Sequence, residues 1–239
     1  MNPKYKSVLL KLSGEAMLPA GESSGVSIDA ANNIVSEVAP VIKSGVKVAL
    51  VIGGGNIFRG AAAAATGKIG RAQADTMGML ATVINALALQ EAFERAGLET
   101  SLMTNLALPD IAEPFFHRNA RDHLDKGRVV ILAGGTGRPS FSTDTAASLT
   151  AVEIGAEVLM KGTKVDGVYS ADPVKDPKAK RYEKLTYMDA LTGRLAVMDS
   201  TAISMCMDRN LPIIVFNFFK PGEFQKVVSG ANIGTVVYG

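Results

Sequence analysis

The sequence predicts an α/β sandwich around a mostly parallel sheet. Most of its short apolar runs are apolar on both alternating faces, as in strands that helices cover on both sides. Six such runs occur, at 8–12, 46–52, 129–133, 158–160, 213–216 and 235–238. Segments with helical periodicity lie between them, at 29–44, 72–96, 115–126, 144–154, 199–210 and 222–228. Strands and helices alternate over the whole chain, and no repeat or linker divides it, so one domain over 1–239 is expected.

Several local signals define the ends of these elements. Asp29 is expected to cap the first helix, which runs through Ser44 and ends at Gly45. The helix 72–96 is rich in Ala, Leu and Met, and it either faces the core or contacts another subunit. The alanine-rich segment 61–67 is either a helix or a loop. The polar segment 170–181 is predicted to be an exposed loop and a lid on the nucleotide side.

Composition excludes several classes of protein. The chain has 239 residues, 47% of them apolar and 20% charged, which is typical of a globular protein. The net charge of +2 and the lack of dense basic runs argue against a nucleic-acid partner. The single cysteine, Cys206, excludes an internal disulfide framework and is expected to be a buried thiol. With no signal-peptide core and no apolar run of membrane-spanning length, we expect a soluble, cytoplasmic protein without a membrane partner.

A glycine-rich turn follows the second predicted strand. Gly53, Gly54 and Gly55 come directly after Ile52, and Arg59 lies just beyond. Glycines there allow backbone N–H groups to approach a phosphate, and we expect a helix N-terminus to follow and add positive charge. The alternative interpretation is a tight turn, but its place at the carboxyl end of a strand favours a ligand site.

A second glycine turn, 134–137, follows the predicted strand 129–133, and hydroxyl side chains come after it. Asp144 then lies where a helix should begin, so a helix cap would also explain it. Two such turns indicate two phosphate-bearing groups or one long one. The dinucleotide fingerprint is absent because Phe58 replaces its third glycine, and no P-loop occurs because Ile69 follows Gly67-Lys68.

Phosphoryl transfer requires cations around the moving group. Lys11 and Lys161 end two predicted strands beside the glycine turns, so together they form a plausible clamp on a transferring phosphate. Asp144 would hold the two ammonium groups apart and in place. His117 and His123 are expected to be exposed on a surface helix, without a metal or acid–base role.

These motifs resemble the bacterial UMP kinase family of the amino-acid-kinase superfamily over essentially the full chain. The resemblance is carried by residues 11–15, 53–60, 75–82, 161–169, 171–173 and 197–199. It implies a three-layer αβα fold, ATP carrying Mg²⁺ as donor, UMP as acceptor, and a homohexamer. It also implies inhibition by UTP, and segment 18–27 is similar in placement to a GTP-responsive segment, so GTP is a possible activator.

The same resemblance assigns roles to individual residues. To the catalytic set of Lys11, Lys161 and Asp144 it adds Arg59, and no protein metal ligand is expected. The ATP-binding residues would be Lys11, Leu12, Ser13, Gly14, Gly55, Arg59, Thr163, Tyr169 and Asp172. The UMP-binding residues would be Gly54, Asp75, Thr136, Gly137, Arg138, Pro139, Ser140, Phe141, Ser142 and Thr143. Asp75 would bind the ribose and Tyr169 would stack on adenine, unless Tyr169 is an ordinary strand aromatic. The acceptor side would be roughly 1–160 and the ATP side roughly 161–239.

Two other functions remain open at this stage. One is a related kinase that acts on a carboxylate or a carbamate, although such relatives lack the 75–82 motif. The other is a non-catalytic protein that stores or senses a nucleotide or a metal oxoanion on the same fold. That protein would be expected to lose one of the two lysines or Asp144, and this chain retains all three.

Overall fold

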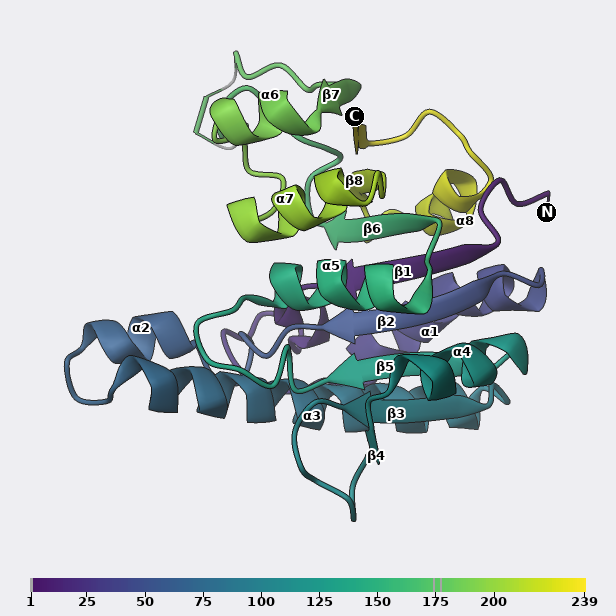
Figure 1. Cartoon of the computed structure of the whole chain (residues 1–239), viewed down its shortest axis with the longest axis vertical. Helices are drawn as coiled ribbons and strands as arrows, with labels where there is room; N and C mark the ends of the chain where they lie inside the picture. Colours follow the sequence, from purple (N-terminus) through teal and green to yellow (C-terminus); the bar gives the residue numbers. More distant parts are fainter. Residues whose placement is uncertain (1, 174, 177) are drawn as a thin grey trace.

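The computed structural model describes residues 2–173, 175, 176 and 178–239. Its strands are β1 (Ser7–Leu12), β2 (Lys47–Ile52), β3 (Thr100–Thr104), β4 (Glu113–Pro114), β5 (Val129–Ala133), β6 (Val158–Thr163), β7 (Lys184–Thr186), β8 (Ile213–Asn217) and β9 (Thr235–Tyr238). They form one sheet in the order β4-β3-β5-β2-β1-β6-β8-β9-β7 (Figure 1). Pairing is parallel except between β8 and β9, which are antiparallel. The six predicted strands are all present, whereas β3, β4 and β7 were not predicted.

The helices are α1 (Ile28–Lys43), α2 (Gly60–Ala65), α3 (Arg71–Arg95), α4 (His117–Asp125), α5 (Thr143–Ile154), α6 (Tyr187–Thr192), α7 (Ser200–Asp208) and α8 (Glu223–Val228), with a 3-10 helix η1 (Gly14–Met17). The six predicted helices are confirmed, and the alanine-rich segment is the helix α2. The prediction that Asp29 caps α1 is wrong. Ser27 is the N-cap because its extended backbone lets its Oγ accept the N–H of Ala30 at 3.1 Å, and Asp29 lies in the first turn.

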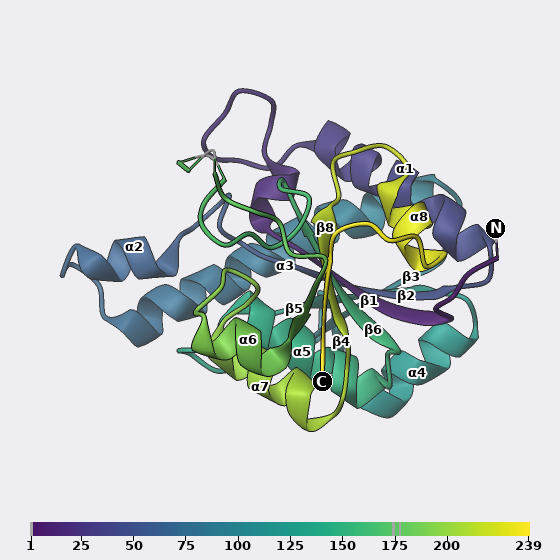
Figure 2. The same ribbon diagram turned by 90° about the horizontal axis from the view of Figure 1, so that it is seen from above.

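Helices cover both faces of the sheet, which confirms the predicted α/β fold. α1, α3 and α8 lie against one face, and α4, α5, α6 and α7 lie against the other (Figure 2), where their buried side chains belong to two separate cores. Alternate strand residues divide between the two cores: Leu10 and Leu12 of β1 join the first and Leu9 the second. Lys11 therefore faces the same side as Leu9, toward α5 and α7.

The expectation that no apolar run reaches membrane-spanning length needs correction. α3 has 25 residues and is apolar enough to span a membrane by length and composition. Half of its most apolar window is buried in the fold, and Phe93 is fully buried among the residues of the first core. This is the pattern of a core helix. α2 and the start of α3 project beyond the rest of the fold (Figure 1).

Two smaller predictions concern Cys206 and the segment 170–181. Cys206 is a free thiol buried under α5, where burial raises its pKa to about 11 and its Sγ lies 3.4 Å from Ser148 Oγ. The expected exposed loop 170–181 closes at its base through an antiparallel bridge between Tyr169 and Arg181. Most of its described residues are exposed, while positions 174 and 177 lie outside the described residues.

Candidate active site

Two lysines lie side by side at the carboxyl end of the sheet. Lys11 of β1 and Lys161 of β6 are register partners in the parallel pair, so their side chains leave the same face. β6 continues three residues beyond its predicted end, which places Lys161 within the strand. Asp144, in the first turn of α5, pairs with both ammonium groups, at 2.5 Å from Lys11 Nζ and 3.0 Å from Lys161 Nζ. Lys161 Nζ also donates to the carbonyl of Val197 at 2.6 Å.

This lysine–carboxylate cluster is largely buried, with side-chain exposures of 10% for Lys11, 18% for Lys161 and 15% for Asp144. Burial alone would raise the pKa of Asp144, but the charges of Lys11 and Lys161 outweigh it and hold that pKa below the usual value. Burial lowers the pKa of Lys161, and nearby Lys11 adds to this against the attraction of Asp144. Two cations thus share one carboxylate, and a phosphate placed here would supply the missing negative charge.

The first glycine turn is packed against the rest of the protein at two of its residues. A Cβ on Gly54 would meet the carbonyl oxygen of Gly78 at 2.7 Å, and one on Gly53 would meet the amide of Gly14 at 2.9 Å. A Cβ on Gly55 would meet only Arg59 Cγ, at an ordinary contact distance of 4.0 Å. The expected helix does not follow directly, because α2 begins only at Gly60. Tight packing therefore explains Gly53 and Gly54, and Gly55 is the glycine that leaves room for a ligand.

A buried amide pair fixes this turn, and it was not predicted. Asn85 of α3 donates to the carbonyl of Gly53 at 2.7 Å and exchanges hydrogen bonds of 2.7 and 3.0 Å with the side chain of Asn56. Asn56 also donates to the carbonyl of Gly25 at 2.8 Å. One turn earlier in α3, Thr82 Oγ1 accepts the amide of Gly134 at 2.8 Å. α3 therefore anchors both glycine turns.

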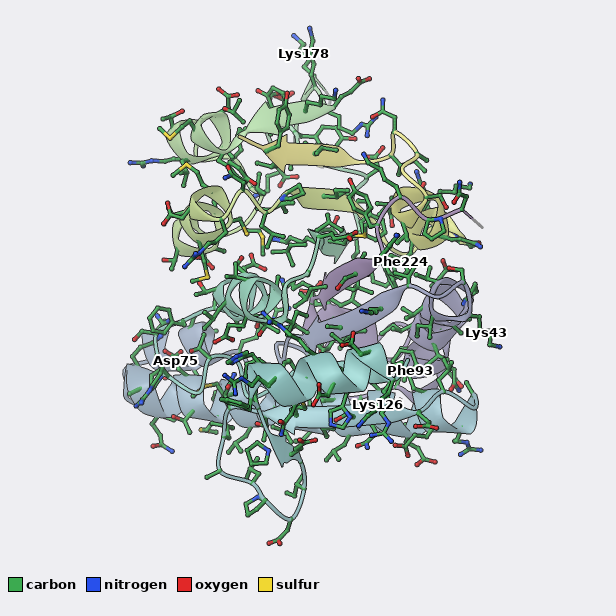
Figure 3. All side chains as sticks on the ribbon, turned by 45° about the vertical axis from the view of Figure 1, so that its right-hand side comes forward. Lys43, Asp75, Phe93, Lys126, Lys178 and Phe224 are labelled. Atoms are coloured by element: carbon green, nitrogen blue, oxygen red, sulfur yellow. The ribbon has the colours of Figure 1, made fainter. Side chains whose placement is uncertain are left out.

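Asp75, at the projecting end of α3 (Figure 3), meets the segment after the second turn. The amide of Ser140 donates to Asp75 Oδ2 at 2.9 Å, and Arg71 Nε contacts both carboxylate oxygens at 2.8 and 2.9 Å. Ser140 has a positive φ of 74°, an uncommon conformation for a residue with a side chain. The residue expected to bind ribose is thus already joined to the expected acceptor segment.

The first glycine turn, α3 and the acceptor segment enclose a cavity of about 330 Å³, which we call the acceptor cavity. It gathers six residues that were expected to bind UMP: Gly54, Asp75, Ser140, Phe141, Ser142 and Thr143. Gly55 and Arg59, expected on the ATP side, also line it. Its lining leaves out four expected residues, Thr136, Gly137, Arg138 and Pro139. It includes eight residues to which no substrate contact was assigned: Phe58, Gly60, Ala61, Arg71, Gly78, Met79, Thr82 and Gly135.

Asp199 links the acceptor segment to α7. It caps α7 and accepts hydrogen bonds from the hydroxyls of Ser142 and Thr145, the latter at 3.0 Å. Ser142 in turn caps α5, so the alternative interpretation of Asp144 as the helix cap is wrong. The motif 197–199 was part of the resemblance without a role of its own. The structure brings that motif to Lys161 through Val197 and to Ser142 through Asp199.

A second cavity of about 230 Å³, which we call the donor cavity, is lined by both lysines. Its lining includes four residues of the expected ATP site or catalytic set: Lys11, Ser13, Lys161 and Thr163. Leu12 is fully buried and Gly14 is packed against Asn56, so these two shape the turn from behind. Tyr169 and Asp172 lie further along the chain, outside the lining of this cavity. The Tyr169 hydroxyl donates to Asp166 at 2.6 Å.

Comparison with known proteins identifies the family. The model of the amino acid kinase family matches residues 6–217. The chain belongs to the amino acid kinase family. Its structure is similar to UMP kinase from Bacillus anthracis, with 37% identity, a TM-score of 0.93 and coverage of 98% of this chain and 96% of that one. UMP kinase from Ureaplasma parvum shows 33% identity and a TM-score of 0.91, covering 99% and 100%. Uridylate kinase from Archaeoglobus fulgidus shows 26% identity and a TM-score of 0.74, covering 96% and 99%.

The histidines of this amino acid kinase lie away from both cavities, on α4. The expectation that they are solvent-exposed is wrong, because both are half-buried. His123 Nε2 lies 2.8 Å from Glu113 Oε2, and its Nδ1 lies 3.0 Å from Arg128 Nη1. Asn119 donates to the other oxygen of Glu113 at 3.0 Å, so His123 and Asn119 together join α4 to β4. We assign His123 a structural role at this edge of the sheet.

Proposed function

We propose that this chain is a UMP kinase, which reversibly transfers the γ-phosphoryl group of ATP to UMP and yields ADP and UDP. The relatives with 37% and 33% identity and nearly complete coverage are UMP kinases. The observation that carries the proposal is the position of the lysine–carboxylate cluster. Thr143 lines the acceptor cavity, and the next residue, Asp144, pairs with both lysines of the donor cavity. The cations therefore stand where two phosphate groups would meet.

The chemistry follows from this placement. A phosphate oxygen of UMP attacks the γ-phosphorus, the bond to the β–γ bridging oxygen breaks, and its electron pair leaves on the β-phosphate of ADP. Lys11 and Lys161 stabilise the charge on the transferring group, and Asp144 keeps their ammonium groups in place before ATP arrives. Arg59, on the rim of the acceptor cavity, adds a further positive charge.

Mg²⁺ fits this site as an ion carried by ATP. Within the described part of the chain, no group of three or more His, Cys, Asp or Glu side chains is arranged to hold a metal. The two carboxylates of the donor side, Glu15 and Asp144, are each paired with two cations. When bound, the ion would neutralise phosphate charge, in addition to the positive charge that Lys11 and Lys161 supply.

We further propose the substrate contacts on each side. The backbone of 11–14 with Gly55 would face the ATP phosphates, and Thr163, Tyr169 and Asp172 would contact adenosine. Gly54 and the segment 136–143 would surround the UMP phosphate and base, and Asp75 would bind the ribose. On this assignment the acceptor side is roughly 1–160 and the ATP side roughly 161–239.

Assembly, regulation and location are also proposals. We propose a cytoplasmic homohexamer that UTP inhibits and GTP activates. α3 supports the subunit contact, because it exposes four large apolar side chains at helical spacing: Met77, Leu80, Ile84 and Leu87.

ADP formation with ATP and Mg²⁺ tests the function directly. The acceptor panel is UMP, CMP, dUMP, AMP, glutamate and carbamate. Activity confined to UMP is the expected result. Phosphorylation of glutamate or carbamate would indicate another kinase of this family. Nucleotide binding without turnover would support a storage or sensing protein.

A further inference from the structure

One carboxylate of the donor cavity, that of Glu15, pairs with two cations at once. Glu15 Oε1 accepts from Arg59 Nη2 at 2.7 Å, and Glu15 Oε2 lies 3.3 Å from Lys164 Nζ. The hydrogen bond from Arg59 lowers the pKa of Glu15, partial burial opposes this, and Lys164 lowers it further. The carboxylate is therefore held in its charged form by two cations at once.

The two cations belong to different cavities. Arg59 lines the acceptor cavity, whereas Lys164 lines the donor cavity together with Glu15. They also come from distant parts of the chain, Arg59 from the residue before α2 and Lys164 from the residue after β6. Both side chains are mostly exposed, with 60% and 64% of their surface accessible, so a phosphate group can reach them.

The backbone around Glu15 is fixed without its carboxylate. Ser13 Oγ accepts the amide of Glu15 and caps η1, and the carbonyl of Glu15 accepts from Leu18 at 3.3 Å. Arg59 Nε is likewise held by the carbonyl of Gly55 at 3.2 Å. The side chain of Glu15 thus adds a link between two backbone segments that are fixed without it.

We propose that Glu15 bridges the two nucleotide cavities and thereby couples their occupancy, an inference that rests on the proposed function. Its carboxylate pairs with Arg59 and Lys164, the cations that phosphates would use. The first nucleotide displaces the carboxylate from its cation and loosens the bridge. The second nucleotide then competes with a carboxylate that is held at one end only and is displaced more easily, so each nucleotide promotes binding of the other.

Two variants separate a bridge from a simple negative charge. Glu15→Gln keeps the shape and removes the charge. Glu15→Asp keeps the charge but shortens the side chain by one methylene, so it no longer spans both cations. If the carboxylate acted only by repelling phosphates, its effect on nucleotide binding would be lost in Glu15→Gln and retained in Glu15→Asp. Glu22→Gln is the matched control, since Glu22 is an exposed carboxylate in the same segment of the chain.

The experiment is calorimetric titration of the full-length protein with UMP and with a non-hydrolysable ATP analogue plus Mg²⁺, each alone and in the presence of the other. In the wild type we expect each ligand to tighten binding of the other about two- to fivefold, the range expected for exposed ion pairs. The factor by which one ligand tightens binding of the other should fall to about one in both Glu15 variants. It should stay at the wild-type value in Glu22→Gln. Lys164→Gln should lower it as well, and adding Glu15→Gln to that variant should lower it no further.

Three results would overturn the bridge: no coupling in the wild type, unchanged coupling in Glu15→Gln, or a loss in Glu15→Gln that Glu15→Asp does not share. Turnover with UMP keeps this test distinct from that of the function. A wild-type chain that phosphorylates UMP but shows one of these results refutes the bridge alone. A chain that binds neither nucleotide refutes the proposed function and the bridge with it.

Discussion

Lys11 and Lys161 lie on neighbouring strands of the sheet, whereas Tyr169 and Asp172 lie on the segment that leaves it. The lysines are buried and held by Asp144 from a third element. The loop that carries Asp172 is mostly exposed, and its Lys178 stands at the outer end of the molecule (Figure 3). Its base is closed by the bridge between Tyr169 and Arg181. The groups proposed to stabilise transferring charge are thus fixed before a ligand arrives, while the groups proposed to bind adenosine are carried on a surface loop.

Asp144→Asn should have the largest effect on stability, because Asp144 is the carboxylate of the buried lysine–carboxylate cluster. It leaves two buried ammonium groups beside each other without a counter-charge, so we expect a loss of about 3–5 kcal/mol in the free energy of unfolding at pH 7. The folded-state pKa of Asp144 lies below its ordinary value of 3.8, so its contribution is present above that pH and is lost as the pH falls through the folded-state pKa. Denaturant unfolding of both proteins at pH 7 and in acid should therefore show a difference that narrows in acid.

Asp125→Asn supplies the control, because Asp125 forms an ion pair with Lys47 that is equally short, 2.5 Å, but exposed. We expect that variant to lose less than about 1 kcal/mol. Equal losses in the two variants would contradict the view that burial gives the Asp144 cluster its importance.

Lys161→Met tests the same cluster through catalysis. Removing one preorganised cation from the transferring phosphate should lower kcat on the order of 10²–10³-fold, by analogy with the loss of one oxyanion-hole donor. Steady-state assay with ATP, Mg²⁺ and UMP measures the change, and circular dichroism verifies folding. Lys43→Met, at the exposed end of α1 (Figure 3), should retain wild-type kcat. A kcat within a few-fold of wild type in Lys161→Met would remove Lys161 from the mechanism.

Much of this cluster could be predicted from the sequence, and the omissions have a physical cause. Buried central strands such as 129–133 carry a continuous apolar signal, and Lys11 and Lys161 were recognisable as polar residues at the ends of such strands. β3 was missed because Thr100 and Ser101 open it with polar residues, and β7 because it has only three residues. The pairing of Lys11 with Lys161 depends on strand order and register, which no local pattern encodes.

Asn85 is a second site residue whose contacts could not be predicted from a local sequence pattern. It lies among apolar residues in the middle of α3, where one amide carries no local signal, and its partners Gly53 and Asn56 are about 30 positions away. The glycine turn was recognised from its own residues, but the side chain that fixes it was not. Long-range polar contacts of this kind are visible only in the folded chain.

Asn85→Leu should show how far the glycine turn depends on α3. Leucine has a similar size but leaves the carbonyl of Gly53 and the amide of Asn56 without their partner, so we expect a loss of about 2–3 kcal/mol in the free energy of unfolding. Chemical denaturation measures it. Gln73→Leu, an exposed amide on the same helix, should stay within about 0.5 kcal/mol of the wild type. A fully stable Asn85→Leu variant would mean that the turn is held by its backbone alone.

Tyr169 lies at the base of the exposed loop, where we expect substitutions to have the smallest effect. If its ring stacks on adenine, Tyr169→Ala should raise the KM for ATP roughly tenfold, within the range for one base–aromatic stack. Tyr169→Phe keeps the ring and loses only the hydrogen bond to Asp166, so its KM should stay within about threefold of the wild type. Both variants should retain the stability of the buried cluster, since neither touches Lys11, Lys161 or Asp144. If Tyr169→Phe instead matches Tyr169→Ala, the hydroxyl and its hold on Asp166, and not the aromatic face, would be what Tyr169 contributes to ATP binding.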